Sequence, residues 1–272
     1  MINLIYLYLV LVGAIAHAST PTESFYHSYK KDANASVDSS ILSISEGFIE
    51  KPYVYDPLGE LGDDLPVIRA DAFDCVTFVD TVLSLSLAKD VGHFEQIWHK
   101  MRYQSQQSSR LERNHFTELH WLDNMQPWLK SCQALPGVKK AVATIDVGAW
   151  YGWYCRTFGY SCMSHEKSLP NEVALTYVPS ETWMEGRIDA RKMLPKVMVV
   201  MVVNKANQQL KDKIGTDMLV SHMGFLYQSD QGLRLRHASS IFKKVVDVDF
   251  IDYVASRKDS SVLGYALFSI HA

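Results

Sequence analysis

Features that mark several large classes of protein are scarce in this chain. Its 272 residues carry a formal net charge of −3, so there is no basic excess of the kind that binds nucleic acid. Four cysteines are too few to hold a chain of this length together as a disulfide scaffold. With 47% hydrophobic and 21% charged residues, the composition also excludes a disordered chain. The sequence is therefore that of a globular protein with a sizeable core.

An apolar segment without charged residues begins the chain. It reads MINLIYLYLVLVGAIAHA and ends in Ala16-His17-Ala18, a small-x-small cleavage pattern. The alternative is a membrane anchor, but the apolar run is shorter than the roughly 20 residues that a spanning helix needs. We expect a secretory signal peptide over residues 1–18 and a periplasmic or secreted protein. After cleavage we expect no stable membrane insertion.

Helical patterns fill the first half of the chain, and β-rich runs fill the last third. We expect helices at 41–48, 73–89, 93–103 and 114–130. We expect strands at 197–204, 219–228, 233–237, 245–250 and 265–270. Helices followed by strands, without βαβ alternation, predict an α+β fold. One domain is expected over 19–272, with an elaborated middle segment at about 137–195 that the pattern does not assign.

Cys75 lies where a loop gives way to the apolar helix expected at 73–89. The start of a helix carries partial positive charge, which favours the thiolate form of a cysteine. A thiolate is the nucleophile of cysteine catalysis, so Cys75 is a candidate nucleophile. A buried free cysteine is, however, more often an inert part of the core. The functional interpretation therefore depends on a partner elsewhere in the sequence.

Two histidines in the β-rich region are candidate partners of Cys75. His222 begins a β-rich run in Ser221-His222-Met223-Gly224-Phe225, 147 residues after Cys75. In papain-like enzymes the base follows the cysteine at about 130–150 residues. His237 ends the next β-rich run, and a hairpin turn at Gln231-Gly232 would bring the two histidines side by side. His237 could then orient the imidazole of His222, as the third group of a triad does.

Together these residues resemble a family of bacterial cell-wall enzymes. The chain resembles the NlpC-type, papain-like cysteine amidases, and most closely their N-acetylmuramoyl-L-alanine amidase-like branch. The matching segments, in chain order, are Pro52-Tyr53-Val54-Tyr55, Phe73 to Asp80, Arg113-Asn114-His115-Phe116 with Trp121, Ser221 to Phe225, His237-Ala238-Ser239-Ser240 and Gly264 to Phe268. The order of a tyrosine, an Asp-Cys pair and two histidines is the specific part of this resemblance.

The resemblance implies a fold and a set of site residues. The fold would be papain-like, with the catalytic cysteine at a helix start packed on a C-terminal antiparallel sheet. Cys75 would be the nucleophile, His222 the base and His237 the third polar residue. Tyr53 would line the site and help to hold the oxyanion, and Asp74 would contact the substrate. No cofactor and no metal ion are implied.

The same resemblance implies the substrate. The protein would cleave the amide between N-acetylmuramic acid and L-alanine in muropeptides, the soluble fragments of peptidoglycan. One alternative is an endopeptidase that cuts the bond between γ-D-glutamate and the diamino acid. A second is an inactive secreted glycan-binding module on the same scaffold, because a fold does not fix a function. The aromatic residues Trp150, Tyr151, Trp153 and Tyr154 could form cleft walls, although such clusters are more often plain core.

The remaining cysteines leave two structural alternatives open. Cys155, Cys162 and His165 could form one corner of a zinc site, but no second pair of ligands supports it. A disulfide between Cys155 and Cys162 fits an oxidising compartment better. Cys132 could compete for either partner, so the pairing of these three cysteines stays open.

Overall fold

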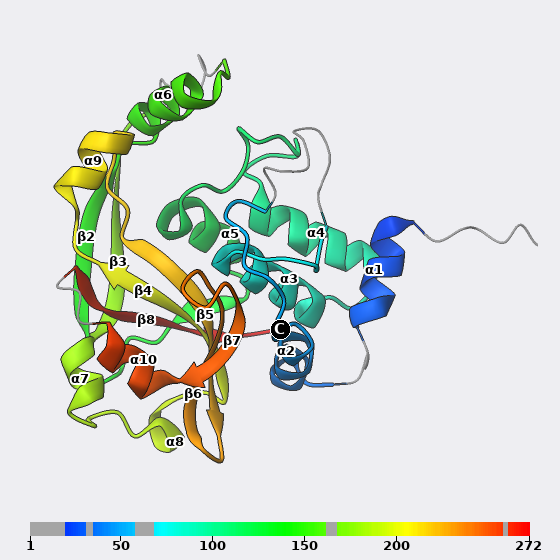
Figure 1. The fold of residues 1–272 in the computed structure, drawn as a ribbon, viewed down its shortest axis with the longest axis vertical. Coiled ribbons are helices and arrows are strands. Elements are labelled where there is room, and N and C mark those ends of the chain that lie inside the picture. The colour runs from blue at the N-terminus through cyan, green and yellow to red at the C-terminus, as the bar shows by residue number, and fades with distance from the viewer. Residues whose placement is uncertain (1–19, 31–34, 58–67, 162–167, 258–260) are drawn as a thin grey trace, which may run out of the picture.

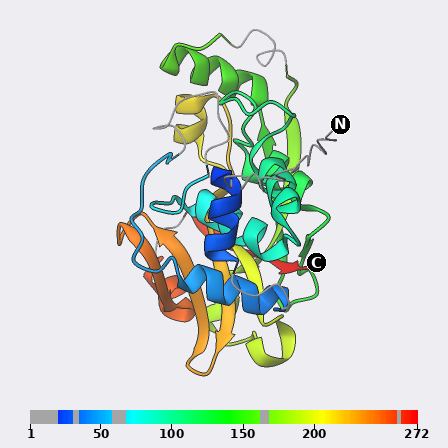
Figure 2. The ribbon, with the colours of Figure 1, turned by 90° about the vertical axis from the view of Figure 1, so that its right-hand side faces the viewer.

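The computed structural model describes residues 20–30, 35–57, 68–161, 168–257 and 261–272. An antiparallel sheet in the strand order β2-β3-β8-β4-β5-β6-β7, with β1 on β8, forms its centre (Figure 1). Helices from the first half of the chain cover one face (Figure 2). The expected α+β fold is thereby confirmed. The signal peptide expected at residues 1–18 lies outside the described residues.

The strands of the last third follow the sequence expectation closely. They are β4 (Val197–Asn204), β5 (Val220–Ser229), β6 (Gly232–Ser239), β7 (Lys244–Asp249) and β8 (Val262–Ile270). Alternate residues of β4 enter two different apolar clusters, one on each face of the sheet. A strand that is buried on both faces reads as a continuous apolar run, which is why the β4 segment was recognisable.

The helices of the first half are α1 (Pro21–Tyr29), α2 (Val37–Glu46), α3 (Cys75–Leu87) and α4 (Val91–Arg102). The long helix expected at 114–130 is wrong. The chain instead forms a π-helical turn, η2 (Thr117–Trp121), then α5 (Leu122–Met125) and β1 (Leu129–Ser131). Pro127 lacks a backbone N–H and disfavours helix in the residue before it, so the helix ends there and β1 joins the sheet.

The middle segment that the pattern left unassigned supplies an edge of the sheet and the helices next to it. It contains β2 (Lys139–Ile145), α6 (Val147–Phe158), β3 (Asn171–Pro179), α7 (Ser180–Met184) and α8 (Ala190–Met193). Helices α9 (Gln208–Ile214) and α10 (Phe250–Ser256) follow later in the chain. None of the helices formed by the described residues has both the length and the apolar character that crossing a membrane requires.

Helix α3 is the buried helix that the sequence predicts, and polar contacts inside the core fix its position. The Asp80 carboxylate pairs with Arg102 of α4 at 3.6 Å, and both side chains are buried. The indole Nε1 of Trp121 donates a hydrogen bond of 2.7 Å to Asp80 Oδ1. Removing one partner of a buried ion pair is strongly destabilising, so this group fixes α3 against α4 and η2.

The paired ladder of β5 and β6 ends at Phe225 opposite Arg236. Beyond it, Val220 and residues 222–224 of β5 pair with β4. The β4–β5 register also shifts at this end, because Val202 lies opposite His222 and the next residue, Val203, lies opposite Val220. Such a bulge turns neighbouring side chains to a new direction. Helix α3 packs against both strands.

Gly224 permits the close approach of the two strands at this point. A Cβ atom on Gly224 would lie 2.8 Å from the Cβ of His237 and 2.8 Å from the carbonyl oxygen of Arg236. Both atoms belong to a paired strand, so neither can move away cheaply. The absence of a side chain at Gly224 therefore brings the His237 side chain against β5.

Replacing Gly224 by alanine should separate the strands. We expect Gly224→Ala to lower the free energy of unfolding by about 1–3 kcal/mol, the usual cost of overpacking. Gly92→Ala is the matched control, since Gly92 is an exposed residue in the first turn of α4 and its new Cβ meets no atom closer than 3.5 Å. Urea unfolding of both variants measures the difference. Equal stability of the two variants would contradict the close approach.

Candidate active site

The start of α3 is fixed by its own residues. The amide of Thr77 donates a hydrogen bond of 2.7 Å to Asp74 Oδ1, and the amide of Asp74 donates one of 3.0 Å to Thr77 Oγ1. This reciprocal capping box satisfies amides that the first turn leaves without partners. Cys75 is thereby held as the first residue of the helix. Asp74, expected to contact substrate, lines the adjoining cavity and also serves as this cap.

Tyr53 also lies beside the start of α3, although it belongs to a different segment of the chain. Its amide donates a hydrogen bond of 2.9 Å to the carbonyl of Lys243, and the next amide, of Val54, donates one of 2.9 Å to Phe73. Phe73 is two residues before Cys75, so this pairing fixes Tyr53 beside the start of α3. Burial, with Cys75 and Asp74 nearby, raises the pKa of Tyr53 to about 12. Its hydroxyl is therefore a neutral hydrogen-bond donor.

The two histidines meet as the sequence predicts. His222 Nε2 lies 2.6 Å from His237 Nδ1, and the two rings are nearly perpendicular, with centroids 4.8 Å apart. His237 is buried, and its ring also packs on that of Tyr253 from α10, at 5.4 Å between centroids. His237 is thus placed to orient the imidazole of His222.

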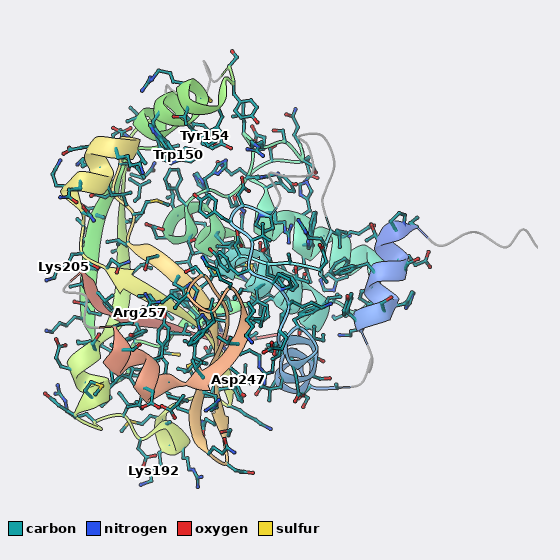
Figure 3. All side chains as sticks on the ribbon, viewed as in Figure 1. Trp150, Tyr154, Lys192, Lys205, Asp247 and Arg257 are labelled. Carbon is teal, nitrogen blue, oxygen red and sulfur yellow. The ribbon has the colours of Figure 1, made fainter. Side chains whose placement is uncertain are left out.

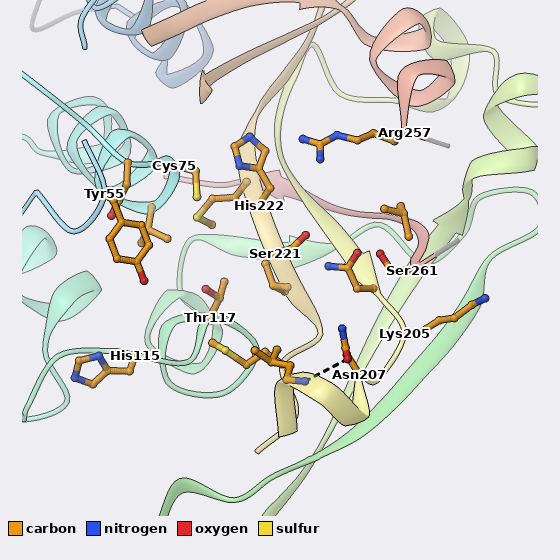
Figure 4. A pocket seen from close by; sticks show the side chains of 18 of the residues that line it. Tyr55, Cys75, His115, Thr117, Lys205, Asn207, Ser221, His222, Arg257 and Ser261 are labelled. Atoms are coloured by element: carbon orange, nitrogen blue, oxygen red, sulfur yellow. Dashed lines mark hydrogen bonds between the residues drawn. The ribbon is translucent and has the colours of Figure 1, made fainter. Parts of the chain in front are cut away.

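A cavity of about 630 Å³ brings these residues together (Figure 4). Its lining includes all of the predicted site residues except His237, which lies directly behind His222: Tyr53, Asp74, Cys75 and His222. The rest of the wall comes mainly from the start of β5 and the segments that follow β4 and α10. A cavity of this size falls within the range of small-molecule sites.

The surroundings of Cys75 favour the neutral thiol, against the effect expected of the helix start. Burial and the Asp74 carboxyl raise the pKa of Cys75 to about 12. The backbone amides of Met223, Cys75 and Val76 act in the opposite direction, since each can donate to the sulfur. The effect of desolvation on the pKa of Cys75 is larger than the combined effect of these amides and of the helix start. The thiol must therefore lose its proton to a base when it reacts.

His222 is also neutral. Burial lowers its pKa well below the usual value, and the nearby His237 and Arg257 lower it further. Burial and Arg257 lower the pKa of His237 to about 4, while Asp247 acts in the opposite direction. If His222 accepts the Cys75 proton at Nδ1, its Nε2–H must donate to His237 Nδ1. A protonated His237 has no acceptor at Nδ1 and would break this arrangement.

Arg257 is a site residue that the sequence did not reveal. It follows the end of α10, and its guanidinium points toward His222 in the cavity (Figure 4). It donates a hydrogen bond of 2.8 Å to the Tyr253 hydroxyl and lies over that ring. No carboxylate among the described residues forms an ion pair with it. No local motif surrounds Arg257, so only the packing of α10 against β6 could have revealed it.

The aromatic residues near position 150 and the remaining cysteines only partly follow the sequence expectations. Trp150, Tyr151 and Tyr154 are buried, and Trp150 and Tyr154 also line a second cavity together with Trp153. Cys155 is disulfide-bonded, which makes it unsuitable as a zinc ligand, whereas Cys75 and Cys132 are free thiols. Cys162 and His165 lie outside the described residues, so the pairing with Cys162 stays a prediction.

Comparison with known families identifies the chain. It belongs to the AmiA-like family, described as N-acetylmuramoyl-L-alanine amidase-like, whose family model matches residues 43–262. The matched range includes Tyr53, Cys75, His222 and His237. No curated protein sequence matches the chain.

Solved structures share this fold over nearly the whole chain. The crystal structure of a Legionella pneumophila protein is 26% identical, with a TM-score of 0.77, covering 92% of this chain and 93% of that one. An N-acetylmuramoyl-L-alanine amidase from Bacteroides uniformis is 20% identical, with a TM-score of 0.65 and coverages of 87% and 99%. A putative xylanase from Bacteroides fragilis is 21% identical, with a TM-score of 0.64 and coverages of 83% and 98%. The Bacteroides structures show likeness of fold alone.

The charge on Arg257 should set the titration of the histidine pair. Because a nearby cation disfavours the imidazolium, Arg257→Gln should raise the pKa of His237 above its value of about 4. The neutral pair would then be lost at a higher pH as the solution is acidified. NMR titration of the imidazole signals measures this shift, and Arg257→Lys, which keeps the charge, should leave the midpoint near that of the wild type. An unchanged midpoint in Arg257→Gln would show that Arg257 does not act on the pair.

Proposed function

We propose that the protein is a papain-like cysteine amidase of the NlpC type that cleaves the amide between N-acetylmuramic acid and L-alanine in muropeptides. The observation that carries this proposal is the shared cavity, in which a cysteine at a helix start faces a histidine backed by a second histidine. Membership of an amidase-like family supports the substrate class. The name of the Bacteroides uniformis structure, an N-acetylmuramoyl-L-alanine amidase, agrees with it.

The first chemical step forms an acyl-enzyme. The Cys75 sulfur attacks the carbonyl carbon of the amide while its proton passes to His222, because the thiol is not ionised at rest. The carbonyl oxygen becomes an oxyanion beside the start of α3. The Cys75 backbone N–H and the Tyr53 hydroxyl, which its raised pKa keeps protonated, would donate hydrogen bonds to that oxyanion. His222 then gives its proton to the leaving amine, and the C–N bond breaks.

The second step returns the enzyme to its starting state. Water attacks the thioester carbonyl as His222 takes one of its protons, and the C–S bond breaks to release a carboxylic acid. The proton on His222 returns to the Cys75 sulfur. Throughout, His237 accepts the Nε2–H of His222 and so holds the ring orientation. His237 acts through His222 and is a positioning residue.

The cellular location of the protein is proposed on the same basis. Peptidoglycan lies outside the cytoplasmic membrane, and the apolar segment at 1–18 has the pattern of a secretory signal. We therefore propose that the protein is periplasmic or secreted. The disulfide at Cys155 is in keeping with an oxidising compartment.

Mass spectrometry of the reaction products distinguishes the proposed reaction from its alternatives. Wild-type protein incubated with an N-acetylmuramoyl tripeptide should release free N-acetylmuramic acid and an intact tripeptide with an unblocked L-alanine. A His222→Ala protein, checked for folding by circular dichroism, is the control and should release neither product. N-acetylmuramoyl-L-alanyl-D-glutamate among the products would instead show the endopeptidase reaction. If the N-acetylmuramoyl tripeptide stays uncleaved in the presence of folded wild-type protein, the result would indicate an inactive module.

A further inference from the structure

A buried glutamate that the proposed mechanism does not use lies close to the cavity that holds Cys75. Glu118 belongs to the π-helical turn η2, and Thr117, the residue before it, lines that cavity. No ion pair is formed by Glu118 among the residues that the structure describes. A buried carboxyl group without a cation is costly unless hydrogen bonds compensate for the lost hydration. The hydrogen bonds of Glu118 therefore indicate what it does.

The carboxyl group of Glu118 is bonded to the backbone that leads into β5. The amide of Leu219, the residue before β5, donates a hydrogen bond of 2.5 Å to Glu118 Oε1. The carbonyl of Leu219 accepts a hydrogen bond of 2.8 Å from the amide of Asn204, at the end of β4. His222 follows Leu219 by three residues. Glu118 thus fixes the point at which the strand that carries the candidate base begins.

The other end of η2 is bonded to the helix that carries Cys75. Trp121 donates its indole hydrogen bond of 2.7 Å to Asp80 of α3, and both side chains are buried. One short turn therefore holds α3 through Trp121 and the start of β5 through Glu118. A π-helical turn is rare, and such turns occur frequently at functional sites.

The turn itself is held in place by the residue before it. The amides of His120 and Trp121 donate hydrogen bonds of 3.0 and 3.2 Å to the carbonyl of Phe116. The Phe116 ring is buried and packs edge-on against Trp150 of α6, with centroids 5.2 Å apart. Figure 3 shows Trp150 on the side of α6 that faces the rest of the molecule. The position of η2 is thus fixed by packing, independently of Glu118.

We propose that Glu118 is a positioning residue that holds His222 at its working distance from Cys75, an inference that rests on the proposed function. It acts through the backbone of Leu219 and touches neither the substrate nor the thiol. A displacement of about 1 Å in a reacting group can lower a rate by about a hundredfold, so an anchor at the start of β5 has a measurable effect on catalysis.

The contact needs an acceptor oxygen and does not need a charge. Burial raises the pKa of Glu118, and the amides of Leu219 and Val220 act in the opposite direction. Oε1 can accept the Leu219 hydrogen bond in both protonation states, because a protonated carboxyl group keeps a carbonyl oxygen. Glutamine has the same length and also keeps this oxygen. Methionine is of similar length but has only a weak acceptor, so it removes the hydrogen bond while filling the space.

Alkylation of Cys75 by iodoacetamide tests this geometry without any substrate. A base that takes the thiol proton speeds the alkylation, so the rate reports how well His222 is placed. Glu118→Met should slow labelling by roughly tenfold, whereas Glu118→Gln should label at close to the wild-type rate. Mass spectrometry of the Cys75 peptide measures this rate separately from that of Cys132. His222→Ala gives the rate expected when the base is absent.

Asp217→Asn is the matched control. Asp217 is a buried acidic residue two positions before Leu219, and it pairs with Lys211 of α9 at 3.6 Å and not with η2. This variant should label at the wild-type rate. Circular dichroism checks the folding of each variant, and Glu118→Asp, whose shorter side chain should also slow labelling, replaces Glu118→Met if the latter does not fold. A folded Glu118→Met or Glu118→Asp protein that labels at the wild-type rate would overturn the proposal, as would an equal loss in Glu118→Gln.

Steady-state cleavage of an N-acetylmuramoyl tripeptide gives the second arm of the test. Glu118→Met should lower kcat by roughly tenfold, and Glu118→Gln should restore it. A wild-type kcat in folded Glu118→Met would refute the positioning role and leave the amidase intact. Slower labelling of Cys75 in Glu118→Met, in a protein whose wild type cleaves no amide, would support the positioning role and refute the amidase.

Discussion

The end of the β5–β6 ladder at the Phe225–Arg236 pair, with Gly224 close against His237 just beyond it, is the constraint on which the candidate site depends. The first residues of β5 pair with β4 there, and α3 packs against both β5 and β6. The Met223 amide can then donate to the Cys75 sulfur. Gly224 acts at the same point, because any side chain there would collide with His237. One local break in a regular sheet thus positions the thiol, the base and the residue that orients the base.

The electrostatics of the site follow from burial. Desolvation raises the pKa of Cys75 and lowers that of His222, so both groups are neutral at rest. A neutral pair costs less to bury than an ion pair without further partners. In the proposed reaction, the amides at the start of α3 and the Tyr53 hydroxyl would stabilise the negative charge that develops on the oxyanion. The charge would then be stabilised as it forms, and the resting protein would not have to bury it.

Much of this arrangement could be predicted from local sequence. The apolar run of β4, the hairpin turn at Gln231-Gly232 and the helix that begins after Asp74 each depend on neighbouring residues, and all three are correct. The meeting of His222 and His237 followed from that hairpin. The hairpin register brings Gly224 against His237, and His222 reaches His237 diagonally from two residues away.

The parts that sequence did not reveal depend on contacts between distant segments. The helix expected at 114–130 failed because Pro127 and pairing with β8 outweighed its amphipathic pattern. Arg257 reaches the histidines only because α10 packs against β6. The aromatic residues of α6 looked like ordinary core, and most of them are buried. That Trp150, Trp153 and Tyr154 also line a cavity becomes visible only in the three-dimensional arrangement.

The central claim is that Cys75 is the nucleophile, and the initial rate of amide cleavage in N-acetylmuramoyl-L-alanyl peptides tests it most directly. Removal of a catalytic nucleophile typically lowers the rate by several orders of magnitude, and we predict such a loss for Cys75→Ala. Cys132→Ala removes the other free thiol among the described residues, which lies outside the cavity, and should cleave at the wild-type rate. Cleavage by Cys75→Ala at the wild-type rate would contradict the account.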